Sequence, residues 1–450
     1  MMTLLGVLLF VVGLAFSIWF HELGHFVWAR RFGMRVTQFM VGFGPTLWSR
    51  RIGETEHGVK AIPLGGYIRI VGMMPPGDED LAGRKLGRLR KLVEEVRGAS
   101  LLDIGPGDGD RVFYRKPWWQ RIIVMSAGPA HNLVFAFVLF TIILVGFGIP
   151  TPTTTVDSVS QCVLPATAPR DAGCNVPVDE TGAPCEAGPD CAIPVRSPAS
   201  EAGFQPADRI VAIDGRPLDS WDGVRGVIRG SPDEPITVTV LRDGDEVDLT
   251  VTPLPNRVYA DGTGESDETV TVGFLGLGPT TPYVQQPITS VPGQVGEFIA
   301  EAAQRLIGIP AKMPQLFRAA FLGEERDVNG PVGIVGVGRI SGEVFGLPAE
   351  DAPFQEKMIF FLGLLASLNM VLFLFNLVPL YPLDGGHVAG ALWEKARAVV
   401  ARLRHKPDPG PFDTARLMPV AYVVASVFIV LSGLLLVADI VNPITLDSLQ

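Results

Sequence analysis

The chain has 450 residues, of which 47% are hydrophobic and 19% are charged, and its mean hydropathy is +0.31. This composition is too apolar for an ordinary soluble enzyme and predicts a membrane protein. The formal net charge of −10 gives no indication of nucleic-acid binding, so we expect the lipid bilayer, and no nucleic acid, as a partner.

Four stretches lack Asp, Glu, Lys and Arg: residues 1–20, 122–150, 358–383 and 417–438. Each reaches the roughly 20 residues that a spanning helix needs. We therefore predict a polytopic α-helical protein of the cell membrane with four transmembrane helices, at residues 1–29, 121–150, 358–384 and 417–440. The first helix is expected to be retained, because it lacks the basic start and the small-residue cleavage site of a signal peptide.

The first predicted helix carries His21, Glu22 and His25 near its end. His21 and His25 lie one helical turn apart on one face, where two imidazoles can bind one zinc ion. Glu22 lies beside them and can hold a water without being a ligand. Ionisable groups in so apolar a helix cost on the order of 3 kcal/mol each, and a bound metal would offset that cost. The alternative is a pair of hydrogen-bonded core histidines.

Residues 30–120 join the first two helices. Residues 42–73 are rich in glycine and β-forming residues, and 67–71 alternate in polarity, which predicts a small membrane-associated β-sheet. A charged insertion follows at 74–111, with a predicted amphipathic surface helix at 81–96.

The charge distribution predicts the orientation in the membrane. Residues 27–121 contain 17 Lys and Arg against 10 Asp and Glu, whereas residues 151–357 contain 14 against 30. Basic loops remain in the cytoplasm. We therefore expect residues 30–120 and the basic loop 385–416 to be cytoplasmic, and residues 151–357 and both termini, including the tail 441–450, to lie outside.

Residues 151–285 show the pattern of a small α/β domain. A short helix is expected before Gly203, followed by a strand at 209–213 that ends in the turn Asp214 and Gly215. A hairpin turning at Asp243 and Gly244 comes next. This order resembles a PDZ domain of the type found in bacterial proteases.

Four cysteines lie within this extracytoplasmic region, in a polar stretch without a Cys-x-x-Cys pair: Cys162, Cys174, Cys185 and Cys191. Two disulfides fit an oxidising exterior, whereas a zinc ribbon does not fit the spacing. The three possible pairings remain open, as does the alternative of four free thiols.

Residues 286–357 contain an amphipathic segment at 295–322 that is too short and too charged to span, and it is expected to lie along the membrane surface. The third helix is then predicted to end at Asp384. Because the first and third helices run in the same direction, Asp384 and His25 should reach the same depth, near the cytoplasmic face. Asp384 would supply the third zinc ligand and leave one position open. His387 is the rival ligand.

The pairing of "HELGH" with "LDGG" resembles the site-2 protease family of intramembrane zinc metalloproteases, peptidase family M50. The resemblance is to the bacterial regulator-of-sigma-E branch, in an actinobacterial form, and covers nearly the whole chain. "IPLGGYIRI" resembles the re-entrant β-loop of that branch, "AGPAHN" its Gly-Pro-x-x-Asn motif, "SPASEAGFQPADRIVAIDG" its PDZ signature and "NGPVGI" the segment before the third span. The chain differs from this family in three ways. It has one PDZ-like domain where some members have two, and Pro382 stands one residue later than in the common pattern. It also carries two insertions, the cysteine-bearing stretch and the charged segment at 74–111.

This resemblance implies a zinc metalloendopeptidase with one Zn²⁺ per chain. It implies His21, His25 and Asp384 as ligands and Glu22 as general base. Asn376, Pro379 and Asn132 would help to position the substrate, and an edge strand would hold its unwound backbone through the segment that contains Gly65, Gly66, Ile68 and Ile70.

The implied substrates are single-span membrane proteins, typically anti-sigma factors that another protease has already shortened outside, as in regulated intramembrane proteolysis and stress responses. The outer PDZ-like region would then act as a size filter. The alternative functions are a PDZ-bearing membrane scaffold or a chaperone with a structural metal, but neither explains Glu22 between two ligands.

Overall fold

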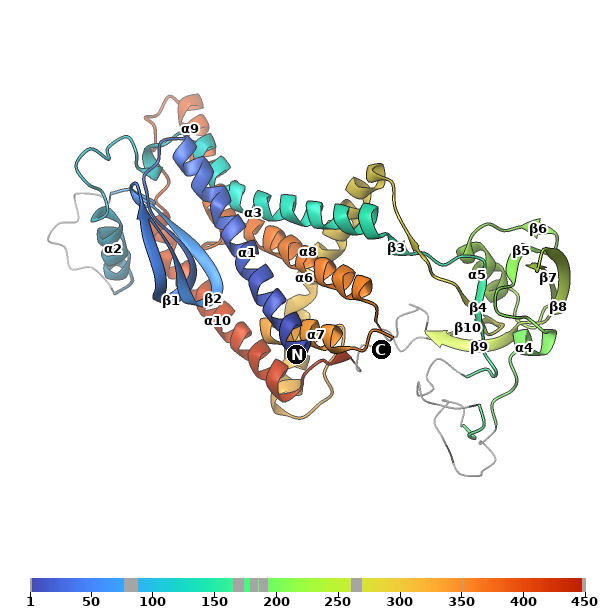
Figure 1. Cartoon of the computed structure of the whole chain (residues 1–450). Helices are drawn as coiled ribbons and strands as arrows, with labels where there is room; N and C mark the ends of the chain where they lie inside the picture. The colour runs from blue at the N-terminus through green and yellow to red at the C-terminus, as the bar shows by residue number, and fades with distance from the viewer. Residues whose placement is uncertain are drawn as a thin grey trace. The chain divides into compact units, whose positions relative to one another are not determined.

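The structure is a computed structural model that describes residues 2–76, 88–164, 174–178, 185, 193–259, 269–350 and 352–446. It divides into two compact units, residues 1–147 with 286–450 and residues 148–285. Four helical segments of the first unit are long and apolar enough to cross a membrane (Figure 1): α1 (Met2–Arg31), α3 (Trp118–Thr141) with η3 (Ile142–Phe147), α8 (Phe354–Leu377), and η5 (Thr414–Leu417) with α10 (Met418–Val441). They coincide with the four predicted spans.

The third span ends earlier than its predicted boundary at residue 384. Helix α8 stops at Leu377, and Asp384 is the first residue of a separate helix, α9 (Asp384–Leu403). The reason is local, because Pro379 and Pro382 lack the N–H that would continue a helix. Asp384 therefore lies at a helix start, and not at the end of the span.

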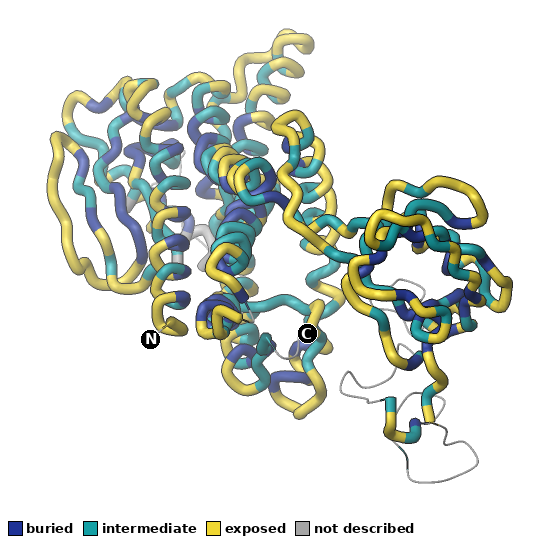
Figure 2. Tube along the Cα trace, turned by 45° about the vertical axis from the view of Figure 1, so that its right-hand side comes forward, coloured by how far each residue is buried: buried dark blue, intermediate teal, exposed yellow. Residues whose placement is uncertain are grey.

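Helix α1 lies at the centre of the first unit. It packs against α3, α7 (Ile334–Gly346) and both strands of a β-sheet. Phe10, Leu14 and Ile18 of α1 form a buried cluster with Phe39 and Val41 of that sheet. Outer helical surfaces are exposed in Figure 2, as expected for lipid-facing sides, and α10 is the most exposed of the four candidate spans.

The sheet comprises β1 (Val36–Ile52) and β2 (Thr55–Ile70), which pair antiparallel. Residues 38–41 of β1 pair with β2 twice, with 56–59 on one side and with 66–69 on the other. The last part of β2 therefore forms an edge of the sheet. Helix α2 (Arg88–Leu101) follows, and the first residues of the helix predicted at 81–96 lie outside the described residues.

The segment predicted to be amphipathic is one helix, α6 (Val291–Phe321), which continues through Pro310 and Pro314 and packs against α10. The carboxylate of Asp439, fully buried in α10, accepts hydrogen bonds from Gly333 N and Gly336 N at the start of α7. It also accepts one from Arg326 Nη2 at 2.9 Å. Asp439 thus caps α7 from a neighbouring helix.

The second unit contains a four-stranded sheet in the order β6-β5-β7-β8. Its other described elements are the helices α4 and α5 and the strand pairs β4–β11, β3–β12 and β9–β10. The predicted strand at 209–213 is confirmed as β5, and the predicted hairpin turn separates β7 from β8, with Asp243 and Gly244 at positive φ. In chain order, the described elements of the unit are β3 (Ile149–Pro150), β4 (Val156–Val159), α4 (Pro198–Ala202), β5 (Arg209–Ile213), β6 (Arg216–Pro217), α5 (Trp221–Gly230), β7 (Ile236–Arg242), β8 (Asp245–Val251), β9 (Leu254–Tyr259), β10 (Thr269–Phe274), β11 (Leu277–Pro279) and β12 (Tyr283–Val284).

One of the predicted disulfides joins Cys162 to Cys174. Cys185 is also disulfide-bonded, and no described cysteine is free. Cys191 lies outside the described residues. The expectation of oxidised cysteines is therefore confirmed for the three that the structure describes.

Candidate active site

The two histidines of α1 lie on one face, as the helical spacing predicts. His25 Nε2 is 3.2 Å from His21 Nε2. His25 is buried and His21 half-buried. Both rings therefore present one nitrogen to the same point at the side of the helix.

Asp384 completes this group from the start of α9. Its Oδ2 atom lies 3.3 Å from Nε2 of His21 and 3.3 Å from Nε2 of His25. Two ligands of a tetrahedral zinc ion, each about 2.0–2.1 Å from the metal, are about 3.3 Å apart. The three atoms therefore have the spacing of one face of the tetrahedron that a zinc ion would take.

Helix α3 orients both imidazoles from behind. His25 Nδ1 lies 2.7 Å from the carbonyl oxygen of Val124, to which a protonated Nδ1 donates. His21 Nδ1 lies 3.1 Å from the side-chain amide of Asn132, which is fully buried. The Val124 carbonyl thus fixes the His25 tautomer that leaves Nε2 free for a metal. The Asn132 amide does the same for His21 when its oxygen, which has no other partner among the described residues, faces Nδ1 in place of the nitrogen. Asn132, predicted to contact the substrate, thus contacts a histidine of the site.

The absence of a side chain at Gly128 of α3 leaves space for the imidazole ring of His25. A Cβ atom added at Gly128 would lie within 2.7 Å of two ring carbons of His25. A larger residue would therefore push the imidazole out of its position. This is the physical role of the glycine in "AGPAHN".

Glu22 lies beside the group and is only 8% exposed. The backbone of Ile68, on the edge of the sheet, lies near its carboxylate. Because Glu22 follows His21 directly, its side chain diverges from the two imidazoles around the helix. Its carboxylate is nevertheless close enough to interact electrostatically with His21, His25 and Asp384.

The start of α9 is fixed by two contacts. A Cβ atom added at Gly385 would lie 2.5 Å from the carbonyl oxygen of Leu377, so only glycine allows this close return of the chain. Further along α9, Glu394 forms a largely buried ion pair with Arg121 of α3. Asp384 is therefore held against the helix that also orients the histidines.

His387, the rival ligand, is not part of the group formed by His21, His25 and Asp384. Its ring lies 4.6 Å from the ring of Tyr381 and 6.4 Å from that of Phe113, between centroids. Burial lowers the pKa of His387 to about 4, so the ring is neutral at physiological pH. The geometry favours Asp384 as the third ligand.

The other predicted site residues differ in their surroundings. Asn376 donates a hydrogen bond to the Leu372 carbonyl within α8, and Pro379 is exposed in the turn that follows. Gly66 and Ile68 lie on the edge of the sheet near α1, with Gly65 directly before them, and the side chain of Ile70 is buried in the core while its backbone continues the same strand.

The residues that sequence reasoning missed are Val124, Gly128 and Glu394. Val124 acts through its backbone, which no side-chain pattern reveals. Glu394 lies in a segment predicted to be a charged loop, and its ion-pair partner, Arg121, is distant in sequence. Gly128 was visible in the "AGPAHN" motif, but its function depends on the contact with His25.

Comparison with known proteins places these features among proteases. Residues 9–406 match the family model of peptidase family M50. The zinc metalloprotease Rip1 of Mycolicibacterium smegmatis is 35% identical over 461 residues, covering 99% of this chain and 100% of that protein. Rip1 of Mycobacterium tuberculosis (strain Erdman) is 32% identical over 456 residues, with the same coverage. The metalloprotease MmpA of Caulobacter vibrioides is 30% identical over 407 residues, covering 86% of this chain and 85% of that protein.

Proposed function

Because this chain belongs to peptidase family M50, the site-2 protease family, we propose that it cuts single-span membrane proteins within or near their transmembrane segments. It is a zinc metalloprotease and a membrane protein with four candidate spans. The observation that carries the proposal is the triangle of His21, His25 and Asp384 ligand atoms, formed where the candidate span α1, which also carries Glu22, meets the start of α9.

The proposed residue roles follow from this geometry. His21, His25 and Asp384 hold the metal, and when bound, zinc supplies Lewis acidity to the attacking water and the scissile carbonyl. Glu22 takes a proton from that water and later gives it to the leaving amine. Val124 and Asn132 keep the two imidazoles in orientation through their outer nitrogens.

The substrate backbone must be unwound, because a helix hides its carbonyls from a nucleophile. The edge of β2 next to Glu22 offers backbone groups to an extended segment, which would add to the sheet as a further strand. Gly65, Gly66 and Ile68 are the residues of this edge that we assign to substrate binding. Asn376 and Pro379 would act from the turn after α8.

The substrate class is proposed from the resemblance to the regulator-of-sigma-E branch: anti-sigma factors already shortened outside the membrane. The charge distribution supports a cytoplasmic site with both termini and residues 151–285 outside. In this orientation the second unit, proposed to be a PDZ-like domain, acts as a size filter for the outer part of the substrate.

The test compares Glu22→Gln with Asp384→Ala in the purified full-length chain. Glu22→Gln keeps the size of the side chain but cannot accept a proton, so cleavage of a single-span reporter should fall by about 10²–10⁴-fold with zinc retained. Asp384→Ala should abolish cleavage and weaken zinc binding by at least about tenfold. Zinc content after mild chelation is measured beside cleavage. If the Asp384 variant keeps zinc as firmly as the Glu22 variant, Asp384 is not the third ligand.

A further inference from the structure

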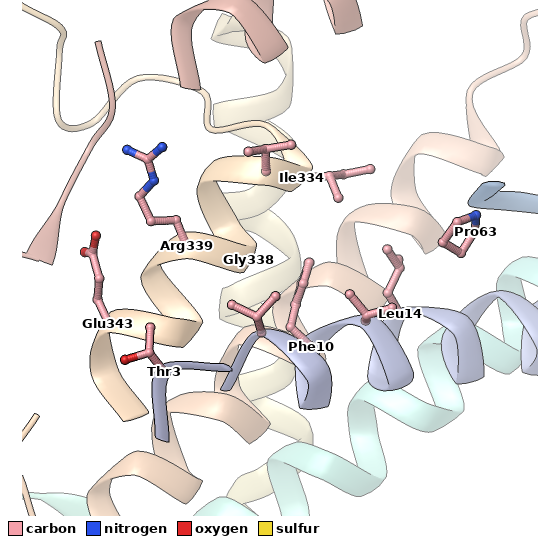
Figure 3. Close-up of a pocket in the computed structure, with 11 residues that line it drawn as sticks. Thr3, Phe10, Leu14, Pro63, Ile334, Gly338, Arg339 and Glu343 are labelled. Carbon is pink, nitrogen blue, oxygen red and sulfur yellow. The ribbon is translucent and has the colours of Figure 1, made fainter. Parts of the chain in front are cut away.

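A groove of about 630 Å³ runs between α1, α7 and the β2 strand (Figure 3). Phe10 and Leu14 of α1 point toward α7 in this view, and Pro63 lies at the end next to the sheet. The lining is mostly apolar: Thr3, Val7, Phe10, Val11, Leu14, Pro63, Ile334, Val335, Gly338, Arg339 and Glu343.

The groove lies on the same side of α1 as the candidate active site, and the sheet covers the helix between them. Leu14 lines the groove, and Ile18 and Glu22 follow it at intervals of four residues, on the same side of the helix. Gly66 of β2 lies directly over this stripe, since a Cβ atom there would be 2.9 Å from carbons of both Ile18 and Glu22. From Leu14 to Glu22 the distance along the helix is about 12 Å.

The end of the groove on α7 carries the positive charge of Arg339. Arg339 is half-buried and makes no ion pair or hydrogen bond with any residue that the structure describes. Glu343, one turn later, also lines the groove, and its Oε2 accepts a hydrogen bond from the backbone N–H of Leu446. Among the described residues, the lining that an occupant would meet is mostly apolar, with Arg339 as its one cation and Glu343 as its one carboxylate.

We propose that this groove receives the transmembrane helix of the substrate before it unwinds, with an acidic residue of the substrate next to Arg339. The proposal rests on the proposed function and identifies where the substrate docks. An apolar helix in the groove would lie parallel to the Leu14–Glu22 stripe. Its next residues would then reach the β2 edge, where an extended strand can form.

Two adjacent valines of α1 give a matched test. Val11 lines the groove and is 39% exposed, whereas Val12 is 58% exposed on the neighbouring side and does not line it. The full-length chain is reconstituted in vesicles with a synthetic single-span reporter that carries Asp at its outer flank. Val11→Trp fills the groove and should lower kcat/KM for the reporter about tenfold. Val12→Trp should stay within about twofold of the unchanged chain.

Equal effects of the two substitutions would overturn the proposal. Zinc content and melting temperature are measured for both variants, because a folded Val11 variant must bind zinc normally for the comparison to count. If Val11→Trp misfolds, a charge exchange between the chain and the reporter provides a second test. Arg339→Glu should lower cleavage of the Asp reporter about tenfold, and a reporter with Lys in place of Asp should restore it. Absence of this rescue would also contradict the proposal.

A crosslinking experiment identifies the occupant directly. A photoreactive side chain is placed at position 335, in the groove, of a chain that also carries Glu22→Gln. An adduct with the reporter is expected, whereas an adduct with vesicle phospholipid alone would show that the groove holds lipid. Cleavage of the reporter by the Glu22→Gln chain would contradict the proposed function instead. If the unchanged chain cleaves the reporter normally and Val11→Trp and Val12→Trp have the same kcat/KM, only the docking site is contradicted.

Discussion

Replacing Gly128 by alanine tests how the active site is built. The new Cβ atom would lie within 2.7 Å of two carbons of the His25 ring, whereas ordinary contacts begin at 3.4 Å. Nε2 of that ring would lie closer still, so the ring would have to move by roughly 1 Å. Because the His25 imidazole is held at Nδ1 by the Val124 carbonyl, it cannot move without weakening that hydrogen bond.

The displacement acts directly on the metal site. Nε2 of His25 lies 3.2–3.3 Å from the other two ligand atoms, and a shift of this size takes it away from the ~2.0–2.1 Å zinc–nitrogen distance. We expect Gly128→Ala to weaken zinc binding about 10–100-fold, as loss of an orienting contact does. Reporter cleavage with excess zinc should fall about 10²-fold, the usual effect of a misplacement near 1 Å.

The matched control is Gly363→Ala on α8, where an added Cβ would meet no atom within 4 Å. Alanine favours a helix over glycine by about 0.8–1 kcal/mol, so this variant should be as stable as the unchanged chain and fully active. The assay is zinc content after graded chelation, with reporter cleavage measured on the same samples. A Gly128→Ala chain that retains zinc and activity like the Gly363 variant would refute the packing argument.

Two further predictions concern buried charges. Arg242→Met leaves the buried Asp208 carboxylate without its partner and should destabilise the second unit by about 2 kcal/mol, measured as faster limited proteolysis. The control is Arg225→Met, which removes an exposed ion pair and should cost less than about 1 kcal/mol. Equal effects of the two substitutions would contradict the argument. Asp439→Ala leaves Arg326 buried and unpaired and uncaps α7, so it should lower thermal stability by about 3–5 kcal/mol; an added Arg326→Met should restore part of this loss, and no restoration would count against the pair.

Local sequence determined several parts of this protein. Four apolar stretches specify four spans, because length and hydropathy are properties of each segment alone. The spacing of His21 and His25 fixes their common face, because a helix turns by the same angle at every residue. The turns at Asp214 and Asp243 follow from residues that tolerate positive φ, and the strands beside them were predicted correctly.

Only the tertiary structure decided what surrounds these elements. Asp384 and His387 were both possible ligands by sequence, and the return of the chain at Gly385 brings only Asp384 to the histidines. The role of Gly128 depends on a ring more than a hundred residues earlier in the chain, and the groove beneath Pro63 depends on three elements from different regions. Propensity and periodicity act over a few residues, whereas these contacts arise from packing between segments that are distant in sequence, so no local pattern specifies them.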